Sequence, residues 1–122
     1  MADNPVTKVK GRLMKLTFTW TSDGDGDATV ATNLALTGKP LGGIFIPGSG
    51  DDQPSADYDA TFTDADDVDL LQGNGADLTA TANDYLTEAN ILPLVNSVGT
   101  LTISNAGDTK SGTFVLFLEG LF

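Results

Sequence analysis

One segment near the C-terminus, residues 113–119, constrains the fold more than any other part of the sequence. It reads Thr-Phe-Val-Leu-Phe-Leu-Glu, so apolar side chains would occupy both faces of a strand formed by it. A strand without a polar face is typical of a central position in a sheet covered on both sides. We therefore predict a central strand here, which the other strands pair with or cover.

A second strand is predicted shortly before it, at 98–104. Leu101 and Ile103 share one face of this segment, and threonines occupy the other face. The connection, 105–112, contains Gly, Asn and Asp, which favour chain reversal. This pattern predicts an antiparallel hairpin formed by the two C-terminal strands.

The N-terminal half shows the same period of two. The first predicted strand carries apolar residues at alternate positions, namely Met14, Leu16, Phe18 and Trp20. Two Asp-Gly steps at 21–27 predict a tight turn. A strand at 29–37 is expected to form a hairpin with the first strand, and Gly38-Lys39-Pro40 is expected to end it.

Two further strands are predicted in the middle of the chain. The segment 41–46 is short and apolar, and its two glycines suggest a bulge or a close backbone approach. The segment 57–63 alternates most regularly, with Tyr58, Ala60 and Phe62 predicted to face inward.

The region 78–92 permits two interpretations. Asn83 could cap a short helix that ends before Pro93, because a residue that precedes proline avoids helical angles. An irregular loop is the alternative.

About seven or eight strands spaced by 8–12 residues predict an all-β fold, either an antiparallel β-sandwich or a small barrel. A chain of 122 residues is long enough for one such domain. We expect this domain to span residues 13–122 and to follow an extended N-terminal arm at residues 1–12. An ordinary frayed terminus is the alternative interpretation of the arm.

The composition excludes several classes of chemistry. The chain has no cysteine and no histidine, so it lacks disulfides, thiolate nucleophiles and the commonest general base and transition-metal ligand. The N-terminus has no signal-peptide pattern, and no apolar run reaches the length of a membrane span. We expect a soluble protein that folds in the cytoplasm, requires no cofactor and does not bind a membrane.

The net charge of −11 is unevenly distributed. Residues 1–15 hold four basic residues against Asp3, which gives +3. Residues 16–122 hold 16 acidic residues against Lys39 and Lys110, which gives −14. Because phosphate binding needs a basic face, this domain should repel nucleic acid and anionic membranes.

Two groups of aspartates are candidate cation sites. Asp23, Asp25 and Asp27 resemble the start of a calcium loop, but Ala28 and Leu34 stand where an EF-hand needs Gly and Glu. A calcium site of another type and a solvated turn both remain open. The same alternatives apply to a second group, which comprises Asp64, Asp66, Asp67 and Asp69.

No enzyme is predicted. Paired carboxylates could serve a glycosidase, but these aspartates lie on predicted turns without an apolar pocket that would separate their pKa values.

Several segments resemble a group of small acidic virion proteins of tailed bacteriophages. The resemblance rests on strands and turns from residue 13 onward, at 16–22, 48–64, 101–107 and 111–118. Within virions, the chain resembles capsid decoration (cement) proteins, which bind the outer shell as symmetric oligomers, often trimers. The resemblance implies the major capsid protein as partner, a homo-oligomer, and a location on the capsid exterior.

For a decoration protein, the arm is a candidate strap that adds a strand to the sheet edge of a capsid partner. The residues expected to bind the partner are Pro5, Lys8, Lys10 and Arg12. Deleting residues 2–12 is expected to leave the fold intact and to abolish capsid binding. The alternatives are a head–tail joining or tail protein of the virion and, from another class, a calcium-dependent carbohydrate-binding sandwich.

Overall fold

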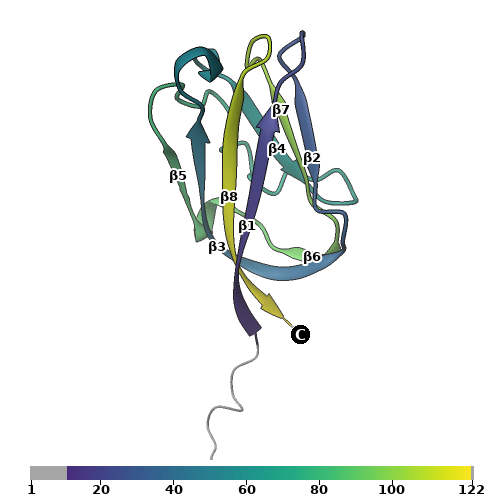
Figure 1. Cartoon of the computed structure of the whole chain (residues 1–122). Coiled ribbons are helices and arrows are strands. Elements are labelled where there is room, and N and C mark those ends of the chain that lie inside the picture. Colours follow the sequence, from purple (N-terminus) through teal and green to yellow (C-terminus); the bar gives the residue numbers. More distant parts are fainter. Residues whose placement is uncertain (1–10, 122) are drawn as a thin grey trace, which may run out of the picture.

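The computed structural model describes residues 11–121 as an all-β fold (Figure 1). The elements are β1 (Gly11–Thr21), β2 (Ala28–Ala31), β3 (Leu36–Pro47), β4 (Asp59–Thr63), β5 (Asp84–Thr87), β6 (Leu94–Ser97), β7 (Thr100–Ser104) and β8 (Ser111–Leu121), with 3-10 turns η2 (Gly50–Asp52) and η3 (Glu88–Asn90). Within these residues, no helix has the length and apolar character needed to span a bilayer.

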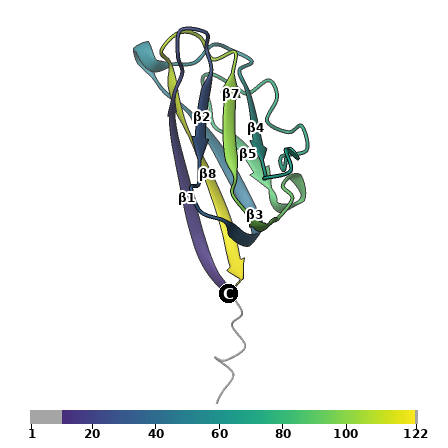
Figure 2. The ribbon, with the colours of Figure 1, turned by 90° about the vertical axis from the view of Figure 1, so that its right-hand side faces the viewer.

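The strands form two antiparallel sheets, which confirms the sandwich and excludes the barrel. The larger sheet has the order β1-β8-β3-β5, with β6 also paired to β3, and the smaller sheet has the order β2-β7-β4. Figure 2 shows the two layers from the side. Each sheet turns one face toward the other, and the buried side chains lie between them.

Strand β8 is central, as the sequence predicts. It pairs with β1 over eleven consecutive residues, from Ser111 opposite Thr21 to Leu121 opposite Gly11, and it pairs with β3 on its other side. Its inward residues Phe114, Leu116 and Leu118 are buried. The predicted cover on its second face differs from the structure, because no third layer of described residues packs there.

The predicted C-terminal hairpin is wrong. Strands β7 and β8 follow each other in the chain but lie in opposite sheets. Leu101 and Ile103 of β7 therefore face the core across from Phe114 and Leu116 of β8, and all four are buried. Burial of both apolar faces in one core favours this crossing over a direct pairing.

The predicted N-terminal hairpin is wrong for the same reason. Strand β1 belongs to the larger sheet, and β2 pairs with β7 in the smaller one. The Asp-Gly turn between them connects the two sheets. A hydrogen bond from the loop between β7 and β8 fixes the backbone of this turn, because the Ala106 N–H donates to the Gly26 carbonyl over 3.1 Å.

The boundary predicted at 38–40 is also wrong, since this segment lies inside β3. Pro40 occupies a position opposite Leu118, and an extra residue shifts the register between Pro40 and Gly42. The predicted bulge is thus confirmed, and it accommodates a proline that has no N–H to donate. The close backbone approach is confirmed at Gly42, where a Cβ would lie 3.0 Å from the Leu86 carbonyl oxygen.

The region 78–92 forms neither the predicted helix nor a wholly irregular loop. It contains strand β5 followed by the single turn η3. Thr87, rather than Asn83, precedes the turn as its cap. Its backbone N–H donates to the Asn90 side chain over 2.8 Å.

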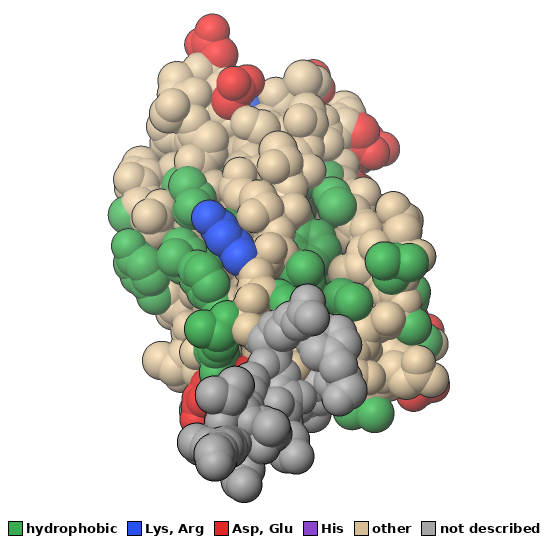
Figure 3. Space-filling model, turned by 60° about the horizontal axis from the view of Figure 1, so that its bottom comes forward, with side chains coloured by type: hydrophobic (Ala, Val, Ile, Leu, Met, Phe, Trp, Pro, Cys, Tyr) green, Lys and Arg blue, Asp and Glu red, His purple; other side chains and the backbone are tan. Residues whose placement is uncertain are grey.

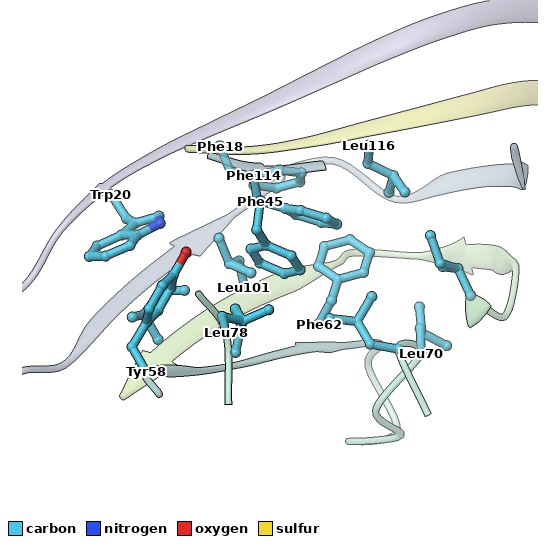
Figure 4. Packing of buried hydrophobic residues seen from close by; sticks show 14 of the residues in the cluster. Phe18, Trp20, Phe45, Tyr58, Phe62, Leu70, Leu78, Leu101, Phe114 and Leu116 are labelled. Carbon is cyan, nitrogen blue, oxygen red and sulfur yellow. The ribbon is translucent and has the colours of Figure 1, made fainter. Parts of the chain in front are cut away.

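Aromatic side chains form the centre of the core (Figure 4). The rings of Phe45 and Phe114 stack at 4.4 Å, and Phe18 meets the edge of Phe62 at 5.4 Å between ring centroids. Phe62 comes from the smaller sheet, so these contacts hold the two layers together. The inward positions predicted for the segment 57–63 are confirmed, because Tyr58, which precedes β4, and Ala60 and Phe62 of β4 are all buried.

Candidate interaction surface

The outward faces of the two sheets differ in chemistry. On the smaller sheet, the outward residues are mainly threonines, including Thr29 of β2, Thr61 of β4 and Thr102 of β7. These three lie side by side across the sheet, since Thr102 is the register partner of both others. Such a polar face is typical of a sheet surface in contact with water.

The outward face of the larger sheet also carries threonines, including Thr17, Thr19 and Thr113, but it adds large apolar side chains to them. Its apolar side chains, which we call the outer apolar face, are Leu13, Leu41, Ile44, Ile46, Tyr85, Val115 and Phe117. Leu13 is 80% exposed and Tyr85 is 70% exposed. Large side chains with this exposure, gathered on one sheet face, are a recognised feature of interaction sites.

The strand register makes this face continuous. Thr17 of β1 lies opposite Val115 of β8, which lies opposite Ile44 of β3, which in turn lies opposite Tyr85 of β5. One row of side chains therefore crosses all four strands. Neighbouring side chains in such a row touch, which explains why Val115 is only 6% exposed although it points outward.

The outer apolar face is also the least acidic part of the body. Most acidic residues among those described lie in loops. Asp84 of β5 is the register partner of Phe45, which faces inward, so Asp84 does not lie on the outer apolar face. Within residues 13–120, the charged side chains at outward positions of β1, β8, β3 and β5 are Lys15, Lys39 and Glu119. Figure 3 shows hydrophobic side chains around a basic one, with acidic side chains toward the upper end and the rim.

The edge of β1 that pairs with no strand within residues 11–121 borders this face. Its eleven pairs with β8 run without a register shift, and no proline interrupts the strand. Edge strands are usually short or bulged, because an open row of N–H and C=O groups attracts other strands. A groove of about 250 Å³ lies beside this edge between β1 and β2, lined by apolar residues that include Leu16, Val30 and Leu36.

The aspartates of the two candidate cation sites accept hydrogen bonds from backbone N–H groups. The Asp23 carboxylate accepts the N–H groups of Asp25 and Asp27, at 2.9 and 3.1 Å. Asp64 accepts those of Asp66 and Val68 in the same way. Within the described part of the chain, no group of three or more carboxylates is placed to hold a metal ion. These carboxylates therefore stabilise turns.

Asp69 has the most partners of these aspartates. Its Oδ1 accepts the N–H groups of Phe62, at 3.2 Å, and Leu71, at 3.1 Å, and its Oδ2 accepts the N–H of Gly73 at 3.0 Å. The first of these bonds ties β4 to the loop that follows it. The neighbouring Leu70 and Leu71 are buried, so Asp69 also positions two core residues.

Two buried polar atoms lie close together at one end of the core. The rings of Trp20 and Tyr58 are 5.6 Å apart between centroids, and both side chains are buried. Neither the Trp20 Nε1 nor the Tyr58 hydroxyl has a hydrogen-bond partner among the described residues. Burial, with a smaller contribution from the Asp84 carboxylate, raises the pKa of Tyr58 to about 12, so its hydroxyl stays neutral. Because Trp20 is buried against the Tyr58 ring, it is a packing residue of the core.

The residues predicted to bind a partner fall largely outside this description. Pro5, Lys8 and Lys10 precede the described residues. Arg12 belongs to β1, where its backbone lies opposite Gly120. The sequence reasoning missed the outer apolar face. Its signal was nevertheless present, because Val115 and Phe117 give β8 a second apolar face.

Comparison with known proteins gives similarity in fold. No protein-family model matches the sequence, and no curated protein matches it. The chain is similar in fold to a chain in the capsid asymmetric unit of cyanophage Pam1, with a TM-score of 0.51 and 15% identity. The match covers 100% of this chain and 93% of that one.

Two further solved structures have lower scores. A chain in the capsid of Ralstonia phage GP4 has a TM-score of 0.48 and 13% identity, with 99% of this chain and 90% of that one covered. The Aeromonas sobria serine protease and chaperone (ORF2) complex has a TM-score of 0.45 and 8% identity, with 91% and 27% covered.

Proposed function

We propose that this chain is a structural protein of a bacteriophage virion that decorates the outer capsid shell and stabilises contacts between major capsid protein subunits. The observation that carries the proposal is the match in fold to a chain of the Pam1 capsid, which covers 100% of this chain and 93% of that one. The resemblance of the sequence to virion proteins supports the same role.

The physical properties of the body suit this role. Eight strands around one aromatic core give a stiff body, and the acidic loops keep it soluble and away from DNA. The proposed contact with the major capsid protein is made by the N-terminal arm, whose Lys8, Lys10 and Arg12 attract an acidic patch of the shell. Strand addition to an edge of the shell protein then supplies the backbone hydrogen bonds.

Deletion of residues 2–10 tests this contact. The deletion ends at residue 10, because Gly11 and Arg12 pair with β8 and their loss would shorten the larger sheet. We expect the truncated protein to melt as the full chain does and to lose binding to purified shells that lack the protein, measured by co-sedimentation. Binding that survives the deletion would contradict the strap mechanism.

A full-length variant with Lys8→Gln and Lys10→Gln is the matched control. It keeps the length and strand-forming capacity of the arm and removes two charges. We expect it to bind more weakly than the wild type at low salt and still better than the deletion variant. The difference from the wild type should shrink as salt rises, because salt screens the attraction that the two lysines supply.

A further inference from the structure

We propose that the outer apolar face is covered by the same face of a second copy of this chain, so that two larger sheets pack across a twofold axis. This inference does not depend on the proposed function, since it concerns the free protein in solution. It explains why β8 has two apolar faces although described residues cover only one of them.

The contrast between the two sheets is the first argument. Both sheets present an outward face, but evolution of a soluble monomer would favour polar residues on each. The threonines of the smaller sheet fit that expectation, whereas Leu13 and Tyr85 on the larger sheet do not. The larger sheet therefore carries, beside its outward threonines, large apolar side chains of the kind that pack between sheets.

The charge of the outer apolar face is the second argument for a second copy as its partner. Two copies of a protein with a net charge of −11 repel each other wherever their acidic loops meet. The outer apolar face carries Lys15, Lys39 and Glu119, so it holds both signs in a small excess of positive charge. Across a twofold axis, a lysine of one copy can approach Glu119 of the other, as a self-complementary interface requires.

The size of the face is also suitable. Strands about 4.8 Å apart that rise about 3.3 Å per residue give the four strands a projected area on the order of 500 Å². A stable interface buries about 800 Å² of accessible surface per partner, and protruding side chains make accessible area larger than projected area. A second sheet of the same size can therefore bury enough surface for a specific contact.

The test is the mass of the free protein in solution, measured by light scattering and sedimentation across a concentration series. We expect the wild type to form a dimer and the double variant Leu13→Asp/Tyr85→Asp to raise the dissociation constant by about 100-fold or more. Both side chains are largely exposed within one copy, so the variant should fold. A circular dichroism melt checks this.

Two matched variants complete the experiment. The variant Thr29→Asp/Thr61→Asp adds the same charge to the outward face of the smaller sheet and should remain dimeric. The protein that lacks residues 2–10 should remain dimeric as well. A wild type that stays monomeric, a dimer that survives Leu13→Asp/Tyr85→Asp, or one lost on deletion of the arm would overturn the proposal. A trimer would overturn the twofold arrangement.

Discussion

At the scale of single residues, the aspartates act as acceptors for backbone N–H groups. We predict that Asp69→Ala lowers the free energy of unfolding by about 2–3 kcal/mol, because three N–H groups lose their acceptor and two of those bonds are partly buried. Urea denaturation measures this.

Asp66→Ala is the control for that variant. The Asp66 side chain is exposed and accepts no hydrogen bond from another described residue, so its loss should change stability by about 0.5 kcal/mol or less. Equal effects of the two variants would show that Asp69 contributes only its charge. The sequence placed both residues in one acidic turn. It could not distinguish them, because composition does not show which carboxylate points back at the chain.

At the scale of secondary-structure elements, the two faces of β8 make a direct comparison. Phe114→Ala should cost about 3–5 kcal/mol, because this ring is fully buried against Phe45. Phe117→Ala should cost about half of that or less in the monomer, since Phe117 is only half-buried on the outer apolar face. Denaturation in the Leu13→Asp/Tyr85→Asp background removes any contribution from self-association. Equal costs would mean that residues of the same chain cover the outer apolar face.

The elements also show which features the sequence determines. Alternation identified the inward side chains of β1 and β4, and the lack of a polar face identified β8 as central. Alternation could not assign strands to sheets, because a strand at either side of a sandwich has the same pattern of inward residues. This explains why both predicted hairpins were wrong.

Strand β3 shows a second reason for failure. Counting alternate positions back from the buried Phe45 would place Leu41 inward and Pro40 outward, and the observed burial is the reverse. The extra residue at the bulge exchanges the two faces, and no local signal stated its position. For this reason alternation does not place Leu41 on the outer apolar face, although it places Ile44 and Ile46 there correctly.

In the whole molecule, two separate surfaces have two proposed roles. The outer apolar face is proposed to join copies of the chain, and the N-terminal arm is proposed to bind the shell. Both follow from the uneven charge, since the acidic body limits close contact to its least acidic face and to its basic terminus. The resemblance and the basic residues of the arm suggested the second of these surfaces. Of the first, the sequence showed the second apolar face of β8, and register then placed side chains from four strands in one row.

The most direct test of the proposed role is the copy number of this chain relative to the major capsid protein in purified virions. Quantitative mass spectrometry with isotope-labelled peptides from both proteins gives this ratio. A decoration protein is predicted to occur at a ratio close to one copy per shell subunit. A few copies per particle would instead indicate a neck or tail position, and absence from the virion would contradict the proposed function.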